Sequence, residues 1–350
     1  MLLKARNFLA AVALTVSTAA SFAQAPLSTD QLLLQTDRQE AQILAIFDIF
    51  KGTPIHYLSA PDARQQFAAE DAAKLLARAS NSEAEPVHLA SVYDLKIPGP
   101  ESTQLPIRVY TPVGQGPFPV VVYYHGGGFV VATIDTYDAS ARALASMAGA
   151  VVLSVEYRKA PENPFPAAYN DAYAAYQFAH NYASTFNGNP ERIAVAGESA
   201  GGNLATEVCL RARDEGFPMP VHQLLVYPVT SSDTGQASDI QYANAIPLNL
   251  ADLQYYLSKY VPSNVSANDP RVAPTNATLR GLPPATIISA QIDPLQSDGI
   301  AYATKLKAAG VAVNYMLYPK VTHEFFGMGS YVQQAKDAES FAASMLRAAF

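Results

Sequence analysis

The 350-residue sequence predicts an α/β fold: a doubly wound, mostly parallel β-sheet with helices on both faces. Two observations support this. Residues 118–124 and 150–155 are short, nearly continuous apolar runs, as expected of strands that are buried on both faces. A helical pattern, residues 137–148, lies between them, and the same alternation continues along the chain. Alternating strands and helices are typical of parallel sheets, in which each crossover packs a helix on the sheet.

Composition indicates one globular α/β domain after a short leader. Hydrophobic residues make up 49% of the chain and charged residues 15%. The net charge is −7 and no basic run is present, which argues against nucleic acid or an anionic membrane surface as a partner. The single cysteine, Cys209, excludes an intrachain disulfide, and we expect it in the core.

Residues 1–23 resemble an export signal. Lys4 and Arg6 precede a short apolar stretch at 8–16, and small residues lead to a cleavage site that we place after Ala23. The apolar stretch is shorter than the roughly 20 residues that span a bilayer. We therefore expect an exported protein, periplasmic or secreted, that has no stable membrane association after the signal is removed. The mature domain is then 24–350.

Residues 28–80 show helical patterns and no strand pattern. The first helix is predicted from an apolar stripe at helical spacing, formed by Ile43, Ile46, Phe47 and Phe50. A second helix is predicted to begin at Ser59, with Pro61 in its first turn, and to include Phe67 and Leu76.

The rest of the chain supplies the sheet. Residues 230–270 interrupt the alternation with polar loops and one helix, 249–260, which we interpret as an insertion beyond the C-terminal edge of the sheet and not as a separate domain. The remaining strands are predicted at 88–97, 105–110, 193–196, 221–227, 284–292 and 311–318.

Ser199 lies where the strand 193–196 turns into a helix, within Gly197-Glu198-Ser199-Ala200-Gly201. A serine flanked two residues away by glycines on a strand–turn–helix is the arrangement of a nucleophile elbow. The helix N-terminus beside it offers unpaired N–H groups to a developing oxyanion. The sequence therefore predicts Ser199 as a catalytic nucleophile.

A glycine-rich loop, His125-Gly126-Gly127-Gly128-Phe129, follows the strand 118–124. Consecutive glycines leave backbone N–H groups unshielded, so the loop is predicted to help bind an oxyanion. We expect His125 itself to be structural.

His323 is the predicted base, because it alone among the six histidines lies in a loop just after a late strand. Asp293 directly follows the preceding strand and is the predicted acid, whereas Asp298 fits the first turn of the next helix. The order Ser199, Asp293, His323 matches the nucleophile, acid and base of α/β hydrolases.

Over roughly residues 85–350 the chain resembles the hormone-sensitive-lipase-like bacterial carboxylesterases, which have the α/β-hydrolase fold. The resemblance rests on five stretches in the right order: His125–Phe129, Tyr157–Ala168, Gly197–Gly202, Asp293–Leu295 and His323. It implies that the amides of Gly126, Gly127 and Ala200 form the oxyanion hole. It also implies a helical cap, which would be built from about 28–80 and an insertion at about 230–270.

Three positions depart from the family pattern. Glu198 stands where Asp or Thr is usual, Lys159 replaces an apolar residue, and Glu324 follows His323 where Gly is usual. None of these changes removes a predicted catalytic group, but Glu324 places a carboxylate beside the base.

The sequence thus predicts a serine carboxylesterase that acts on short- to medium-chain acyl esters through an acyl-enzyme, with a small-molecule ester as its partner and with no metal or cofactor. An amidase or formamidase with the same triad is the alternative. A non-catalytic small-molecule-binding homologue is disfavoured by the presence of His323. The substrate pocket is predicted to include Phe47, Phe129, Tyr255 and Tyr256.

Overall fold

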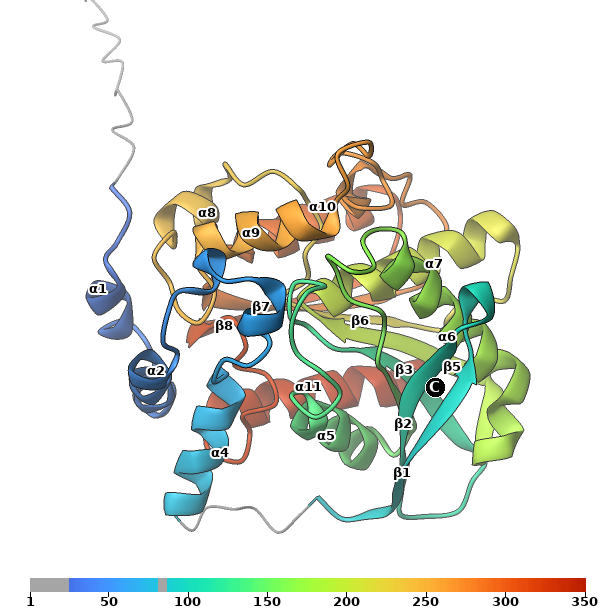
Figure 1. Ribbon diagram of the computed structural model, residues 1–350. Helices are drawn as coiled ribbons and strands as arrows, with labels where there is room; N and C mark the ends of the chain where they lie inside the picture. Colours follow the sequence, from blue (N-terminus) through green and yellow to red (C-terminus); the bar gives the residue numbers. More distant parts are fainter. Residues whose placement is uncertain (1–24, 81–86) are drawn as a thin grey trace, which may run out of the picture.

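Eight strands form one twisted sheet in the order β1-β2-β4-β3-β5-β6-β7-β8, as the computed structural model shows (Figure 1). The structure describes residues 25–80 and 87–350, so the predicted export signal lies outside the described residues. The strands are β1 (Leu89–Pro98), β2 (Gln104–Pro112), β3 (Phe118–Tyr124), β4 (Val151–Val155), β5 (Gly188–Glu198), β6 (Gln223–Val226), β7 (Ala285–Ile292) and β8 (Val313–Thr322).

The sheet is parallel from β4 to β8, and β1 and β2 add an antiparallel edge. All five residues of β4 are buried, which explains why this strand is apolar throughout. The doubly wound, mostly parallel sheet predicted from the sequence is confirmed.

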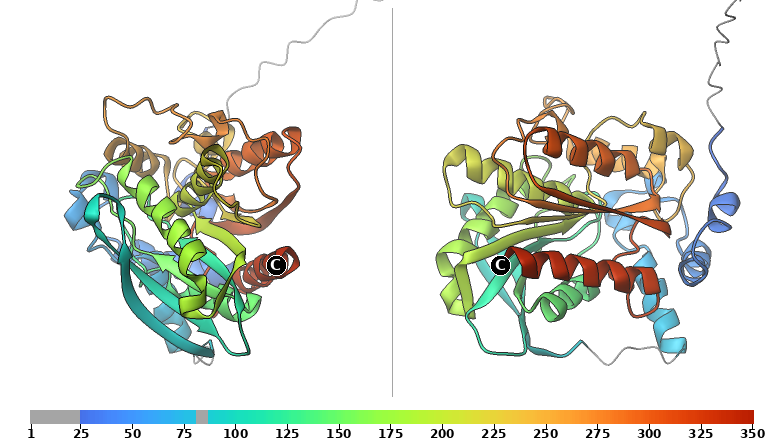
Figure 2. Two further views of the ribbon diagram at one scale, coloured as in Figure 1. Left: turned by 90° about the vertical axis from the view of Figure 1, so that its right-hand side faces the viewer. Right: turned by 180° about the vertical axis from the view of Figure 1, so that it is seen from behind.

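Helices cover both faces of the sheet (Figures 1 and 2). On one face α5 (Asp138–Ala148) packs against α11 (Gln333–Ala349). On the other lie α6 (Ala167–Tyr182), α7 (Ala200–Glu215) and α10 (Gln296–Ala308). The two large hydrophobic clusters of the protein fill these two interfaces, and Cys209 is buried in the second.

The N-terminal segment is helical, as predicted, and lies at the same end of the sheet as the insertion (Figure 1). The insertion contains α8 (Ala237–Gln241) and α9 (Leu250–Tyr260). The N-terminal helices are α1 (Thr29–Leu33), α2 (Arg38–Phe50), η1 (Ile55–Tyr57), α3 (Ala60–Ala63) and α4 (Ala69–Ala79). Short 3-10 helices elsewhere are η2 (Pro100–Ser102), η3 (Ala183–Phe186) and η4 (Pro274–Asn276).

The helix predicted from Ser59 through Leu76 is wrong in one respect, because the structure divides it into α3 and α4. Ser59 does cap α3, but the helix ends at Ala63. Arg64 then donates to the carbonyl oxygens of Val130 and Ala160, both at 2.8 Å. The helix ends at this contact, and Phe67 lies in the short connection between α3 and α4.

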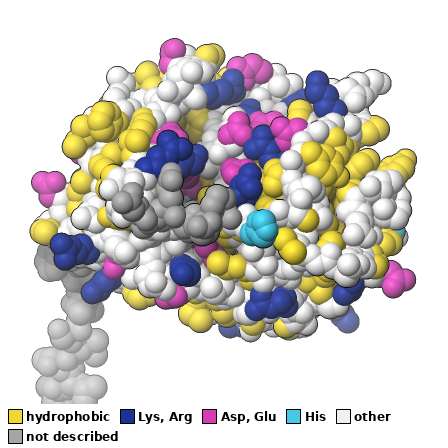
Figure 3. Space-filling model, turned by 90° about the horizontal axis from the view of Figure 1, so that it is seen from below, with side chains coloured by type: hydrophobic (Ala, Val, Ile, Leu, Met, Phe, Trp, Pro, Cys, Tyr) yellow, Lys and Arg dark blue, Asp and Glu magenta, His cyan; other side chains and the backbone are white. Residues whose placement is uncertain are grey.

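The surface seen from below in Figure 3 has Lys and Arg side chains scattered among acidic and neutral ones. Such mixing creates no extended basic field for a polyanion on this face. None of the helices in the described residues combines the length and the apolar character needed to cross a bilayer.

Candidate active site

Ser199 occupies a strained turn between β5 and α7, with φ 54° and ψ −118°. Positive φ is uncommon for residues with a side chain and recurs at functional sites. A Cβ on Gly197 would lie 2.1 Å from the carbonyl oxygen of Gly201, and one on Gly201 would lie 1.9 Å from that of Tyr124. The turn therefore admits no side chain at either glycine.

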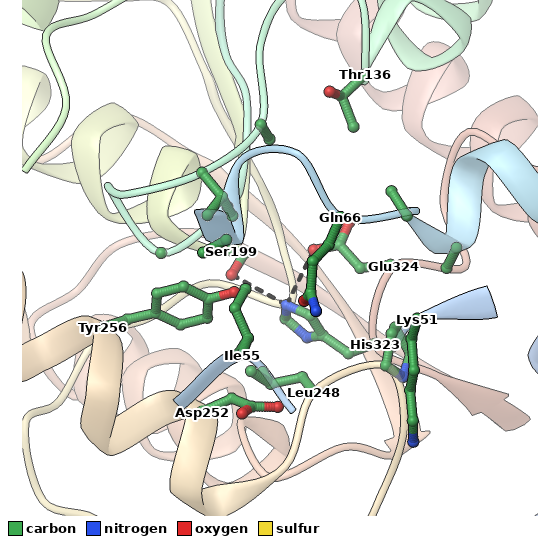
Figure 4. Close-up of a pocket in the computed structure, with 18 of the residues that line it drawn as sticks. Lys51, Ile55, Gln66, Thr136, Ser199, Leu248, Asp252, Tyr256, His323 and Glu324 are labelled. Carbon is green, nitrogen blue, oxygen red and sulfur yellow. Dashed lines mark hydrogen bonds and ion pairs between the residues drawn. The ribbon is translucent and has the colours of Figure 1, made fainter. Parts of the chain in front are cut away.

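Ser199, His323 and Asp293 form one hydrogen-bonded chain. The Oγ of Ser199 lies 3.0 Å from Nε2 of His323, as Figure 4 shows, and Nδ1 of His323 lies 2.8 Å from Oδ2 of Asp293. The fractional exposures of Ser199, His323 and Asp293 are 5%, 3% and 0%. In this geometry the imidazole can accept the serine proton at Nε2 while the carboxylate accepts from Nδ1–H.

Strand topology brings the acid and the base together. Asp293 directly follows β7 and His323 directly follows β8, and these two strands are parallel neighbours. The amide of Leu295 donates to Oδ1 of Asp293 at 2.9 Å and fixes the carboxylate.

Asp298 lies in the first turn of α10, as predicted, but its carboxylate points to the start of the insertion. Its Oδ2 accepts from the amides of Thr230 and Ser231 at 2.7 and 2.9 Å, and its Oδ1 accepts from Gln236. Burial raises the pKa of Asp298 to about 7. This carboxyl holds a loop, and the bond to His323 comes from Asp293.

Three of the other histidines have partners of their own. His125 is buried and stacks on Tyr157 with ring centroids 4.3 Å apart, and burial lowers its pKa to about 4. His56 Nδ1 lies 2.7 Å from Oδ1 of Asp252. His222 Nε2 lies 2.9 Å from the hydroxyl of Thr286. Of the three, His56 also lines the cavity described below.

A tyrosine fixes the first two carbonyl groups of the glycine-rich loop. Tyr157 donates to the carbonyl oxygens of His125 and Gly126 at 2.9 and 3.0 Å. Gly127 has a φ of 93° and Gly128 one of 58°. Within residues 25–80 and 87–350, the amides of Gly126 and Gly127 donate no hydrogen bond.

A cavity of about 440 Å³ opens above Ser199 and His323, between the sheet edge, the N-terminal segment and α9. Gly127 lines it, whereas Gly126 and Ala200 do not. Among the described residues, no group of three or more His, Cys, Asp or Glu side chains is arranged to hold a metal ion.

Three of the four predicted pocket residues, Phe47, Phe129 and Tyr256, line this cavity. Tyr255 does not, which corrects the prediction. Successive residues on a helix point about 100° apart, so α9 can direct only one of the two adjacent tyrosines at the cavity. Tyr256 is the one that points in (Figure 4), and its ring packs on Gly128, where a Cβ would lie 2.2 Å from Cγ of Tyr256.

Three polar residues that line the cavity were not among the predicted site residues, although the sequence had marked Glu324 as a carboxylate beside the base. Glu70, in the first turn of α4, lines the cavity. Its helical pattern gave no signal for this, because an acidic residue in a first turn is ordinary. Glu324 also lines the cavity, with Oε1 3.5 Å from Nε2 of His323 and Oε2 2.6 Å from the hydroxyl of Tyr137. Lys159 lines it too and is ion-paired with Glu156.

Glu198, next to the nucleophile, is buried beneath it. Its carboxylate accepts hydrogen bonds from the hydroxyls of Tyr123 and Tyr227. Burial raises the pKa of Glu198 to about 7. The ring of Tyr227 in turn lies 4.4 Å from that of His323, between centroids, so this carboxyl supports the floor of the site.

Comparison with known proteins identifies the family. A family described as alpha/beta hydrolase fold matches residues 121–327. The carboxylic ester hydrolase LipN of Mycobacterium tuberculosis is 44% identical over 68% of this chain and 65% of its own length, so the match spans just under two thirds of that relative. The carboxylesterase NlhH of the same organism is 44% identical over 67% of this chain and 76% of its own. An ethyl acetate hydrolase of Pseudomonas putida is 34% identical over 82% of this chain and 89% of its own length.

Solved structures of esterases also superpose on this chain. An ester hydrolase from the metagenome of Lake Arreo superposes with a TM-score of 0.80 at 35% identity, covering 89% of this chain and 98% of that one. An esterase of Pyrobaculum calidifontis gives 0.79 at 33% identity, covering 87% and 97%. The chain therefore belongs to the hormone-sensitive-lipase-like carboxylesterases of the α/β-hydrolase fold.

Proposed function

We propose that this protein hydrolyses carboxylic esters of short- to medium-chain acids through an acyl-enzyme on Ser199. The observation that carries the proposal is the hydrogen-bonded chain from Ser199 through His323 to Asp293, at 3.0 and 2.8 Å. A relative that is named an ethyl acetate hydrolase supports small ester substrates.

In the first step Nε2 of His323 accepts the Ser199 proton as the hydroxyl oxygen attacks the ester carbonyl carbon. Asp293 holds the imidazole in the tautomer with the proton on Nδ1 and stabilises the imidazolium. The amides of Gly126, Gly127 and Ala200 are the proposed oxyanion donors, and Gly127 is the one that faces the cavity. One such donor typically lowers the activation barrier by ~3 kcal/mol.

In the second step the imidazolium gives its proton to the leaving alcohol and the acyl-enzyme forms. Water then replaces the alcohol, His323 removes its proton, and the same oxyanion donors bind the second tetrahedral intermediate. The acid leaves, and Ser199 regains its proton.

A fluorophosphonate probe tests the nucleophile. We expect stoichiometric labelling of the wild type and hydrolysis of 4-nitrophenyl acetate, with both lost in Ser199→Ala. Ser344→Ala, on α11, is the control that keeps both. Labelling that survives in Ser199→Ala would refute the assignment.

The leaving group is tested with a panel of paired aryl esters and anilides. We expect the esters to be turned over far faster, because a phenol is a much better leaving group than the aniline of the paired anilide. Preference for the anilides would identify an amidase with the same triad.

We also propose that the protein is exported and cleaved after Ala23, on the basis of the basic and apolar pattern of residues 1–23. N-terminal sequencing of the protein recovered outside the cytoplasm should begin at Gln24. A protein that retains Met1 and stays in the cytoplasm would contradict export.

A further inference from the structure

Glu324 pairs an unfavourable backbone conformation with a carboxylate beside the base. Its φ of 69° lies in the left-handed region, which a residue with a side chain adopts at a cost. Its side chain is 15% exposed, and Oε1 lies 3.5 Å from Nε2 of His323. This is the nitrogen that also faces Ser199 (Figure 4), whereas Asp293 binds the opposite nitrogen.

Glu324 does not stand alone, because Glu70 on α4 lines the same cavity and lies close enough to act on the pKa of Glu324. Two carboxyl groups this close cannot both ionise without strong repulsion, so we expect the pair to share one proton and to carry one negative charge. Burial, and then the charge of its partner, raises the pKa of Glu324 well above its usual value, and burial raises the pKa of Glu70. The hydroxyl of Tyr137 fixes the other oxygen of Glu324 at 2.6 Å.

Apart from His323, the Lys, Arg, His and Asp side chains that line the cavity pair with groups other than Glu324 and Glu70. Lys51 pairs with Asp48, Arg64 with Glu162, Lys159 with Glu156, and His56 with Asp252. In the described part of the chain, the one ion pair that includes Glu324 is with His323. Lys74, one turn beyond Glu70, is instead ion-paired with Asp71 at 3.9 Å.

We propose that Glu324, held in place by Tyr137 and sharing a proton with Glu70, is a positioning residue for His323 that stabilises the imidazolium formed during ester hydrolysis. The inference rests on the proposed function, because it needs His323 to become charged in the transition state.

The negative charge of the pair has little to stabilise while the imidazole is neutral. When His323 takes the Ser199 proton, the charge on Glu324 lies on the side of Nε2 and the charge of Asp293 lies on the side of Nδ1. The proton shared by the carboxyl pair can move onto Glu70 at that moment, which leaves the full charge on Glu324. The interaction therefore strengthens in the transition state and is expected in kcat more than in KM.

A shared proton would also make the rate sensitive to alkaline pH. Loss of the shared proton places two charges in contact, breaks the bond between the carboxyl groups and releases Glu324 from its position. The titratable groups around the pair are Glu70, Asp71 and Lys74 on α4, Tyr123 on β3, Tyr137 before α5, Glu198 at the end of β5, Tyr227 after β6, Tyr256 on α9 and His323 after β8.

The first experiment compares Glu324→Gln and Glu324→Gly with the wild type on 4-nitrophenyl acetate. We expect kcat to fall roughly ten- to hundredfold in both variants, with KM changed little. Glu324→Gly relieves the left-handed backbone, so its melting temperature should not fall, and the loss of kcat in it is not a failure to fold. Glu339→Gln on α11 removes another buried carboxyl outside the cavity and should leave kcat unchanged.

The second experiment uses Glu70→Gln, whose amide can donate to Glu324 but cannot take up or release the shared proton. We expect a kcat between those of the wild type and Glu324→Gln at neutral pH. The decline in kcat on going to alkaline pH, expected in the wild type, should be absent. A structural role alone would not remove this limb of the pH profile.

The outcomes separate this inference from the proposed function. A wild type that is neither labelled by the fluorophosphonate nor active on esters overturns both. An active wild type with unchanged kcat in Glu324→Gln and Glu324→Gly overturns the role of Glu324. An alkaline limb that persists in Glu70→Gln overturns the shared proton.

Discussion

Glu40 on α2 binds Thr322, the residue that precedes His323. Its Oε1 accepts from the amide of Thr322 at 2.9 Å and from the hydroxyl at 2.6 Å. The amide of Asp37 adds a bond of 2.6 Å to the carbonyl oxygen of Lys320. Thr322, directly before His323, is thus bonded to α2, and Glu324, directly after it, lines the cavity together with Glu70 of α4. This segment supports the base as well as covering the cavity.

Glu40→Gln should make the protein more stable at alkaline pH. Burial raises the pKa of Glu40 to about 8 from an ordinary value near 4.5. A carboxyl whose pKa is raised on folding contributes stability below the unfolded pKa, and that contribution is lost as pH rises through the folded one. The wild type should therefore lose up to a few kcal/mol of unfolding free energy through Glu40 between about pH 4.5 and 8. Glutamine still accepts both Thr322 bonds and does not titrate.

Urea unfolding of both proteins at pH 5 and pH 8 checks this expectation. The two should be similar in stability at pH 5, and the variant more stable at pH 8. Glu191→Gln, at an exposed position, is the control and should follow the wild type. Because Glu198, Asp298 and Glu339 also have raised pKa values, near 7, the variant keeps some pH dependence. Parallel curves for wild type and Glu40→Gln would contradict the expectation.

The sequence predicted the features that depend on residues near one another in the chain or on the order of the strands. Strand β3 was predicted with its observed bounds, because burial on both faces leaves an apolar run that needs no knowledge of its neighbours. The proximity of Asp293 to His323 followed from strand order, since residues after adjacent parallel strands meet at one edge. The left-handed φ of Glu324 explains why Gly is usual there, and the sequence marked that position.

Features that depend on tertiary contact were not predictable. The break at Arg64 arises from carbonyl groups of Val130 and Ala160, far along the chain. Neither Glu40 nor Glu70 looks unusual in a helical pattern, and each becomes informative only when its partner beside His323 is known.

Gly127→Val should lower kcat on the order of 10²-fold. Valine disfavours a φ of 93°, and its Cβ would lie 2.4 Å from the carbonyl oxygen of Val131. Both effects displace the amide that faces the cavity. Steady-state kinetics on 4-nitrophenyl acetate, with circular dichroism to verify folding, provide the measurement.

The control for this change is Gly310→Val, where φ is 81° and nothing lies within 4 Å of an added Cβ. It imposes similar backbone strain far from the cavity. Both variants should lose stability, but only Gly127→Val should lose kcat. Equal kcat in the two would mean that the loop does not bind the oxyanion.

Asp293→Asn should abolish most of the activity, whereas Asp298→Asn should retain it. An amide at position 293 can donate to Nδ1 and favour the wrong imidazole tautomer, so kcat should fall on the order of 10⁴-fold. Asp298→Asn weakens bonds to Thr230 and Ser231, so it should lower the melting temperature and leave kcat within a few-fold. If Asp298→Asn abolished turnover while Asp293→Asn did not, the acid would be wrongly assigned.

The last prediction concerns acyl length, which the walls of the cavity should limit. The cavity has a volume of about 440 Å³. Its walls include Phe47 and Phe67 from the N-terminal segment, and Leu248 and Tyr256 from the insertion. Each methylene buried against such walls contributes about 0.8 kcal/mol until the space is filled, and further carbons then force the walls apart. We expect 4-nitrophenyl esters from acetate to hexanoate to give the highest kcat/KM and dodecanoate to be poor. Phe47→Ala should move the optimum to longer chains, whereas Phe50→Ala, one turn along α2, 60% exposed and outside the cavity, should not. An optimum at dodecanoate or beyond, or strong activation by a lipid interface, would identify a lipase and show that these walls yield to long acyl chains.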